Sequence, residues 1–203
     1  MEILKLNSKN LKEISKKVAS LIKKGKVIVY PTDTVYGLIC DTGNKKAVQK
    51  IFKIKNRSFK KPLPVFVKDI KMAKILAKID KKQEGFLKKV WPGKTTVVLE
   101  RKKGKEIYGV DKKTIAIRIP EYKPLNDLLE NINYPLAETS ANISGKPAPG
   151  DIKEIVKQFT LRRGSGQGGK KNQPDLIIDG GTLSKKSSTV VDLTKATPKI
   201  LRK

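Results

Sequence analysis

The stretch VIVYPTDTVYGL (residues 27–38) joins an apolar run to a cluster of short polar side chains. Residues 27–30 predict a short buried strand that ends at Pro31. Thr32, Asp33 and Thr34 then present stiff hydrogen-bonding groups at the strand end, and Gly37 lets the backbone pass close to a ligand. Polar loops at strand ends are natural ligand sites, so this stretch predicts a layered core with a site beside it.

The rest of the chain mixes helical and strand patterns irregularly. Helical spacing of apolar residues predicts helices over residues 11–22, 47–52, 70–90, 124–131 and 151–159. The expected N-caps are Ser8, Asn44, Asp69 and Asp151. Short apolar runs predict strands over residues 27–30, 63–67, 95–100 and 114–120, at the start of 135–151, and in the late segments DLIIDGG and STVVDLT. This mixture predicts an α/β fold with a mixed sheet flanked by helices. The 203 residues show no repeat, and we expect one domain, 1–203.

The composition is strongly basic. The chain has 46 Lys and Arg against 19 Asp and Glu, a formal net charge of +27, which favours polyanionic partners. Most of these cations are lysines spread over nearly every segment, as expected of solvated faces. Arginine is the more informative cation here, because its planar fork binds carboxylates and phosphates through two parallel bonds. The six arginines are Arg57, Arg101, Arg118, Arg162, Arg163 and Arg202.

Histidine is absent, and cysteine occurs once, as Cys40. The missing histidine excludes Ser-His-Asp and Cys-His nucleophile pairs as well as histidine-ligated zinc. The single cysteine rules out an internal disulfide and favours a reducing compartment. No apolar run is long enough to span a membrane, and the first residues have no signal-peptide core. We therefore expect a cytoplasmic protein without membrane contact.

The stretch TIAIRIP (residues 114–120) places an arginine inside an apolar strand. The two-residue period directs its isoleucines to one face and Thr114, Ala116 and Arg118 to the other. An arginine in this setting requires an anion. Two sources of that anion stay open from the sequence: a structural salt bridge to an acidic residue, or the carboxylate or phosphate of a substrate.

Three further stretches gather polar or cationic groups. KNR places Lys55 and Arg57 on one side of an extended loop, with Lys60 and Lys61 close behind. Cations this close repel one another unless a polyanion lies among them, although a solvated basic run is the alternative. ETSANISGKP (138–147) offers hydroxyl and amide groups after a strand, as a ligand loop or as an ordinary polar turn. SSTVVD (187–192) likewise leads hydroxyls into a strand.

The segment GSGQGGKK (164–171) matches the glycine spacing of dinucleotide and phosphate loops. Both kinds of loop require a strand before them and a helix after them. Here Pro174 follows too soon for a helix to start cleanly, and Lys171 stands where a phosphate loop has Ser or Thr. We therefore expect residues 162–171 to form a basic surface loop that is dispensable for chemistry and able to contact RNA.

In chain order, YPTDTVYGL, KNR…KPL, TIAIRIP, TSANISG and SSTVVD…LR resemble the YrdC family, the L-threonylcarbamoyladenylate synthases. The resemblance covers nearly the whole chain and is closest to the short, single-domain form. It implies an open, twisted α/β sheet with a large positively charged cavity. It also implies synthesis of threonylcarbamoyl-AMP and pyrophosphate from L-threonine, bicarbonate and ATP. A downstream threonylcarbamoyl transferase would then use this product to modify the adenosine beside the anticodon of tRNA.

The resemblance also implies residue roles. The Lys-x-Arg and Ser-x-Asn motifs give the catalytic group as Lys55, Arg57, Ser140 and Asn142. L-threonine would be held, with Arg118 on its carboxylate, by Thr34, Arg118, Ser140 and Ser188. ATP would be held by Arg57, Lys61, Thr114, Asn142 and Arg202. Mg²⁺ would arrive with ATP and would have no dedicated protein ligands.

The chemistry that the resemblance implies does not depend on histidine. Its steps require positioning and charge neutralisation more than an acid–base pair, and lysine and arginine supply both. The alternative is an RNA-binding module of the same fold without ATP chemistry, which the net charge of +27 favours. Such a module would need none of the motif residues, whereas a synthase needs them together. Direct tRNA contact through the basic surface is compatible with both functions.

Overall fold

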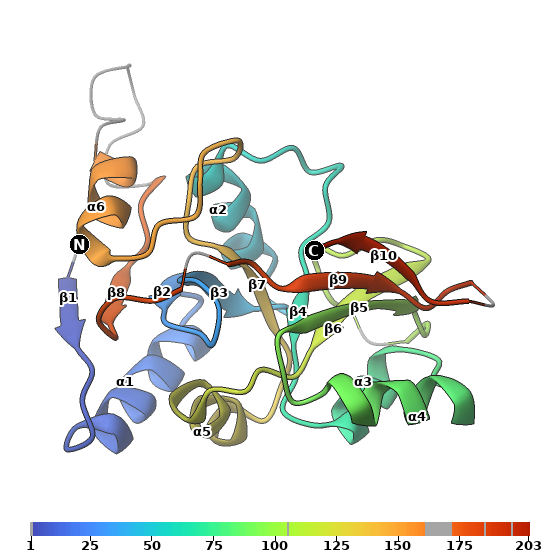
Figure 1. Ribbon diagram of the computed structural model, residues 1–203. Coiled ribbons are helices and arrows are strands. Elements are labelled where there is room, and N and C mark those ends of the chain that lie inside the picture. The colour runs from blue at the N-terminus through green and yellow to red at the C-terminus, as the bar shows by residue number, and fades with distance from the viewer. Residues whose placement is uncertain (1, 105, 161–171, 185, 196) are drawn as a thin grey trace.

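The computed structural model describes residues 2–104, 106–160, 172–184, 186–195 and 197–203 as a mixed α/β structure (Figure 1). Its strands are β1 (Glu2–Lys5), β2 (Ile28–Tyr30), β3 (Gly37–Asp41), β4 (Val65–Phe66), β5 (Thr95–Glu100), β6 (Thr114–Arg118), β7 (Leu136–Ser140), β8 (Leu176–Asp179), β9 (Thr189–Asp192) and β10 (Lys199–Arg202). Its helices are α1 (Leu11–Lys23), α2 (Lys45–Lys55), α3 (Ile70–Leu76), α4 (Lys81–Val90), α5 (Lys123–Ile132) and α6 (Ile152–Thr160).

The described strands form one ten-stranded sheet in the order β1-β8-β2-β3-β7-β4-β6-β5-β9-β10. Four neighbouring pairs, β1·β8, β2·β8, β4·β6 and β5·β9, are parallel, and the other five are antiparallel. The sequence prediction of an α/β fold with a mixed sheet is therefore confirmed. The expectation of a single domain over 1–203 stays a prediction.

Helices cover both faces of the β8-β2-β3-β7 part of the sheet (Figure 1). Val29 packs with α2 and α6 on one face, whereas its neighbour Ile28 packs with α1 and α5 on the other. On the β6-β5-β9 part, Ile117 and Val97 pack against α3 and α4. Because side chains alternate along a strand, Ala116 and Val98 lie on the opposite face, where they line a pocket.

Three of the four predicted N-caps are confirmed by individual hydrogen bonds, whereas α1 begins after Asn10 and not at the predicted Ser8. The Asn44 side chain accepts from the backbone N–H of Ala47 at the start of α2. Asp69 does the same at the start of α3, and Asp151 at the start of α6. These bonds satisfy backbone N–H groups that have no partner inside the helix, which is why Asn and Asp favour this position.

One predicted helix is wrong, and strand β3 was not predicted. The helix expected over 70–90 is two helices, because Ala77 leaves the helical path to pair with Arg101 and Asp80 starts α4 with a capping box. The segment after the Thr-Asp-Thr cluster is strand β3, which pairs with β2 and β7, rather than loop. Its residues Leu38–Cys40 are buried on both faces, and the two-residue alternation that marks a half-buried strand is absent there.

Within the residues that the structure describes, no helix has the length and apolar character needed to cross a membrane. The predicted basic loop over 162–171 lies outside the described residues.

Candidate active site

The face of the sheet opposite α3 and α4 carries a pocket of about 230 Å³. Alternate residues of β5 and β6 form its floor, so the two-residue period that predicted a polar face for TIAIRIP also builds this pocket. Arg57 and Arg202 contribute its cations, and aliphatic side chains make most of its walls. Its lining is Arg57, Pro62, Leu63, Pro64, Thr96, Val98, Val110, Asp111, Thr114, Ala116, Val190 and Arg202.

A second pocket, of about 350 Å³, shares Arg57 with the first. It brings together the end of α2, the loop after it and the loop after β7. Its lining is Lys55, Asn56, Arg57, Ser58, Lys61, Ser140, Asn142, Ser144 and Gly145. The structure thus brings the Lys-x-Arg and Ser-x-Asn motifs into one pocket, although they lie more than 80 residues apart. The single large cationic cavity implied by the resemblance stays a prediction.

Lys55 links the two motifs directly. Its Nζ donates to the carbonyl oxygens of Ser140 and Asn142 at 2.5 and 2.9 Å, and to Asn142 Oδ1 at 2.9 Å. The side chain is 2% exposed. Burial, followed by the nearby charge of Arg57, lowers the pKa of Lys55 to about 7. Three acceptors use all the donors of a lysine ammonium, so Lys55 holds the 140–142 loop in place.

Arg57 is held by backbone oxygens alone. Its Nε donates to the Lys61 carbonyl at 2.9 Å and its Nη2 to the Pro62 carbonyl at 3.0 Å. Partial burial lowers the pKa of Arg57, and the charge of Glu138 opposes this shift. Within the described residues, none of the cations of this pocket, including Lys61, enters an ion pair. The pocket is therefore cationic and uncompensated by direct contact.

Arg118 lies in a different environment. Its guanidinium donates from Nε to the Gly93 carbonyl at 3.0 Å, from Nη1 to Thr34 Oγ1 at 3.1 Å, and from Nη2 to Asp33 Oδ1. The Thr34 hydroxyl also lies 2.9 Å from that of Thr32. Arg118 is 2% exposed, and its pair with Asp33 is the structural salt bridge that the sequence left open. Thr34 and Arg118, both predicted to hold L-threonine, are in direct contact.

Ser188 lies beside Arg202 rather than beside Arg118. The Arg202 guanidinium donates to the Ser188 carbonyl at 2.8 Å and to its Oγ at 3.2 Å. The Ser188 hydroxyl is also 2.9 Å from Thr96 Oγ1. Ser188 was assigned to L-threonine and Arg202 to ATP, so the structure joins residues predicted for different substrates. At the other end of the pocket, Asp111 accepts from the backbone N–H of Thr114 at 3.0 Å.

The sequence interpretation missed three polar residues of this region. Asp33 was noted only as a polar side chain, yet it pairs with Arg118. Thr96 contributes a buried hydroxyl between Ser188 and the floor of the pocket. Glu138 lies on β7, on the same face as Ser140. The two-residue alternation along TTVVLE and LAETS could have identified Thr96 and Glu138.

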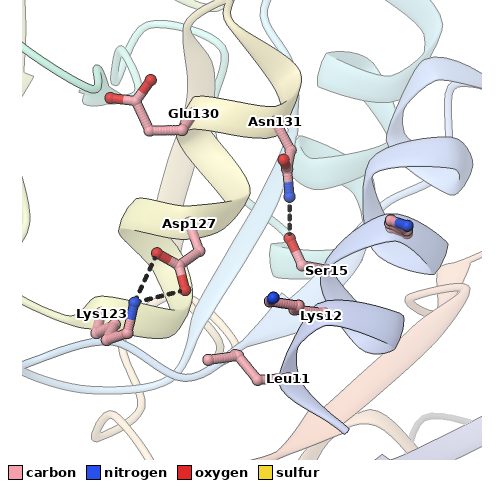
Figure 2. Close-up of a pocket in the computed structure, with 8 residues that line it drawn as sticks. Leu11, Lys12, Ser15, Lys123, Asp127, Glu130 and Asn131 are labelled. Carbon is pink, nitrogen blue, oxygen red and sulfur yellow. Dashed lines mark hydrogen bonds and ion pairs between the residues drawn. The ribbon is translucent and has the colours of Figure 1, made fainter.

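A further pocket, of about 340 Å³, lies between α1 and α5 and contains none of the predicted site residues (Figure 2). Two pairs of its side chains bond each other. Lys123 Nζ donates to both oxygens of Asp127, at 3.2 and 3.1 Å, and Asn131 Nδ2 donates to Ser15 Oγ at 2.8 Å. This pocket is therefore separate from the candidate site.

The described residues contain no group of three or more His, Cys, Asp or Glu that could hold a metal ion. The cations around Arg57 are also the wrong donors for Mg²⁺, which prefers oxygen ligands.

Comparison with known proteins shows the family of this chain. The family model Sua5_yciO_yrdC, described as "Telomere recombination", matches residues 20–203. The chain is 35% identical over 192 residues to the threonylcarbamoyl-AMP synthase of Pyrococcus abyssi, which covers 91% of this chain and 52% of the relative. It is 32% identical over 194 residues to the putative threonylcarbamoyl-AMP synthase of Methanocaldococcus jannaschii, covering 95% and 86%.

Solved structures agree with this assignment. Pyrococcus abyssi Sua5, solved in complex with L-threonine, superposes with a TM-score of 0.83 at 32% identity over 99% of this chain and 56% of that one. Escherichia coli YciO gives 0.83 at 28% identity over 100% and 94%. The chain thus spans about half the length of the Pyrococcus relative. The resemblance drawn from the motifs is confirmed, and the chain belongs to the Sua5/YciO/YrdC family.

Proposed function

We propose that this chain is a threonylcarbamoyl-AMP synthase, a nucleotidyltransferase that joins L-threonine, bicarbonate and ATP with release of pyrophosphate. The observation that carries the proposal is the pair of pockets that share Arg57. One gathers cations without a carboxylate in contact with them, and the other has mostly aliphatic walls. Phosphates suit the cationic pocket of about 350 Å³, and a nucleoside suits the aliphatic pocket of about 230 Å³. Arg57 lies where the two parts of ATP would meet.

The names of the relatives support the same activity. The Pyrococcus abyssi relative is named threonylcarbamoyl-AMP synthase, and its Sua5 structure contains L-threonine. In this chain, Arg57 and Lys61 would bind the phosphates, and Lys55 would add charge while holding Ser140 and Asn142 in place. Thr114 and Arg202 would bind the nucleoside side, since both line the aliphatic pocket.

L-threonine would bind at the corner formed by Thr34 and Arg118. A guanidinium has five N–H donors, and three of those of Arg118 have acceptors among the described residues. The other two remain for the threonine carboxylate. Asp33 and the Gly93 carbonyl fix the orientation of the guanidinium before the substrate arrives, and this preorganisation lowers the entropic cost of binding.

The reaction follows from this placement. The threonine amine captures CO₂ derived from bicarbonate to give a carbamate, and a carbamate oxygen then attacks the α-phosphorus of ATP. Pyrophosphate leaves with the negative charge that Arg57 and Lys61 would stabilise. Mg²⁺ would supply further neutralisation on the triphosphate, held by phosphate oxygens and water rather than by this chain.

The test is pyrophosphate release from the purified protein with ATP, L-threonine and bicarbonate, with each substrate omitted in turn. We expect release that requires all three substrates and that falls in Arg57→Ala. The matched control is Lys46→Ala, because Lys46 is an exposed cation at the opposite end of α2. Release that does not require L-threonine would overturn the proposal.

Two partners extend this proposal. The adenylate would pass to a tRNA-modifying threonylcarbamoyl transferase, because a mixed carboxylic–phosphoric anhydride is reactive and needs a prompt acceptor. The net charge of +27 favours direct tRNA contact through the basic surface. Steep weakening of tRNA binding with added salt would support that contact, and no measurable binding at low salt would exclude it.

A further inference from the structure

Glu138 is a half-buried carboxylate on β7, two residues before Ser140, and no described residue donates a hydrogen bond to it. Its backbone is held, since its N–H donates to the Pro64 carbonyl at 3.0 Å. The sheet therefore fixes the backbone of Glu138, and its carboxylate has no hydrogen-bond partner among the described residues. The carboxylate oxygens of Glu138 are not among the fully buried unpaired atoms, so solvent still reaches them and a ligand could bond them.

The register of the sheet gives its location. Phe66 pairs with both Arg118 and Leu136, so these two side chains lie on the same face. Glu138 is two residues beyond Leu136 and shares that face, as does Ser140 two residues further along. Glu138 thus lies between the Arg118 corner, where L-threonine would bind, and the Lys55–Ser140 corner, where the phosphates would bind.

Ile39 of β3 is the register partner of Glu138, but the carboxyl end of Glu138 lies beside Gly37, which has no side chain. Glu138 Oε2 lies 3.8 Å from the position that a Cβ on Gly37 would occupy, so no side chain of the neighbouring strand covers it there. Thr32 Cγ2, at 3.6 Å from the same position, is the only side-chain atom nearer to it among the described residues. The glycine of YPTDTVYGL therefore leaves space beside this carboxylate.

The charges around Glu138 indicate what it would bind. Burial raises the pKa of its carboxyl group, and the fields of Arg118, Lys55 and Arg202 act in the opposite direction without direct contact. ATP, bicarbonate and the threonine carboxylate are all anions, which a carboxylate repels. The α-ammonium of L-threonine is the only cation of the organic substrates. Asp33, the other acidic residue of this corner, already accepts from Arg118 and from the Glu121 N–H.

We propose that Glu138 binds the α-ammonium of L-threonine and accepts the proton that the amine releases as it becomes the carbamate. This rests on the proposed synthase function. The ammonium and bicarbonate together give the carbamate, one water and one proton: the N–C bond forms, one C–O bond of bicarbonate breaks, and the proton passes to the carboxylate. Arg118 on the carboxylate and Glu138 on the ammonium would then recognise both ends of the amino acid.

The first experiment measures binding by calorimetry, with L-threonine and with the analogue that has a hydroxyl in place of the α-amino group. We expect Glu138→Gln to weaken L-threonine binding about tenfold or more, as for a lost charge-assisted bond, and to leave the analogue unchanged. The matched control is Glu130→Gln, which removes the same charge from α5 outside the site. An unchanged L-threonine affinity in Glu138→Gln would overturn the proposal.

Turnover tests the proton-accepting half. At saturating L-threonine, Glu138→Gln should lower kcat as well as raise the KM for L-threonine, while the KM for ATP stays equal or falls. A change in KM alone would overturn proton acceptance and keep ammonium binding. Tighter ATP binding with unchanged L-threonine binding would mean that Glu138 only balances the neighbouring cations, and would overturn both halves.

Two further controls keep the outcomes separate. If Glu138→Gln does not fold, as judged by its melting temperature, Glu138→Asp and Glu138→Ala take its place in the same assays. If the wild-type protein shows no L-threonine-dependent pyrophosphate release but loses L-threonine affinity in the variant, the synthase proposal fails and ammonium binding stands. If the wild type is active and the variant binds L-threonine normally, the Glu138 proposal fails and the synthase proposal stands.

Discussion

The two ends of the candidate site hold their cations in opposite ways. At one end, Lys55 and Arg57 are held by carbonyl and amide oxygens, and no carboxylate of the described residues contacts either cation. At the other end, Arg118 is buried against Asp33 in an ion pair and is further held by Thr34. Carbonyl oxygens orient a cation without cancelling its charge, whereas a carboxylate does both.

This difference suggests that the two ends would bind different parts of the substrates. The Lys55–Arg57 end keeps a repulsion that a polyanion would relieve, so it suits the triphosphate. The Arg118 end is paired with Asp33 and assembled without a ligand, so under the proposal it would recognise a small carboxylate by the direction of its remaining donors. The predictions below test this division, from the largest expected effect to the smallest.

The largest effect is expected from Arg57→Ala. Loss of a cation that stabilises developing charge on the phosphates should slow pyrophosphate release by about 100-fold or more. Folding should be nearly unaffected, because the variant also removes repulsion of Lys55. The assay compares kcat and melting temperature with those of Lys46→Ala. Near-normal turnover in Arg57→Ala would break the assignment of this end to the triphosphate.

A smaller effect, on one substrate, is expected from Arg118→Lys. Lysine keeps the charge but loses the fork that bonds Asp33, Thr34 and the Gly93 carbonyl. The KM for L-threonine should rise about tenfold, while the KM for ATP changes little. The matched variant Arg202→Lys should instead raise the KM for ATP more than the KM for L-threonine.

The measurement for Arg118→Lys is both KM values and the melting temperature, with and without L-threonine. Equal shifts in both KM values, together with a lower melting temperature and undiminished stabilisation by L-threonine, would make Arg118 a scaffold residue. The ion pair with Asp33 would then be its whole function.

ATP affinity is expected to change severalfold per pH unit because of Lys55. Burial and Arg57 lower the pKa of Lys55 to about 7, and a bound polyanion would raise it. Between these two pKa values binding takes up a proton, so ATP affinity should fall as pH rises above 7. Calorimetry from pH 7.5 to 9 in buffers of different ionisation enthalpy measures both quantities. Lys55→Gln is the control, and an equal pH dependence in that variant would exclude Lys55 as its source.

The smallest effect is expected from residues 162–171, which belong to neither end. Replacing them with a short Gly-Ser linker should leave pyrophosphate release unchanged and should weaken salt-sensitive RNA binding. Loss of ATP binding in this variant would revive the phosphate-loop interpretation of GSGQGGKK.

The sequence predicted the fold class and the motifs well, because those signals are local. Strand 27–30 and the caps at Asn44 and Asp69 follow from hydrophobicity and from hydrogen bonding within a few residues. The sequence did not predict the break in the helix expected over 70–90, because it depends on Ala77 pairing with a residue far along the chain. Strand β3 was missed because burial on both faces removes the alternation.

The site was predictable as a set of motifs but not as a set of contacts. Resemblance named Lys55 and Asn142 together, and the structure joins them through a hydrogen bond. It could not reveal that Ser188 lies beside Arg202, or which anion pairs with Arg118, because both contacts form only when separate segments come together in the fold. The alternation along LAETS could have placed Glu138 on the face of Ser140, but its position relative to Arg118 follows only from the register of the sheet.

The most direct test of the account is the identity of the product. The protein is incubated with ATP, L-threonine and isotopically labelled bicarbonate, and the nucleotides are separated and weighed by mass spectrometry. We expect the mixed anhydride of AMP and N-carboxythreonine, carrying the label and formed in an amount equal to that of pyrophosphate. Unlabelled AMP or ADP alone, or an adenylate of threonine without the labelled carbon, would contradict it.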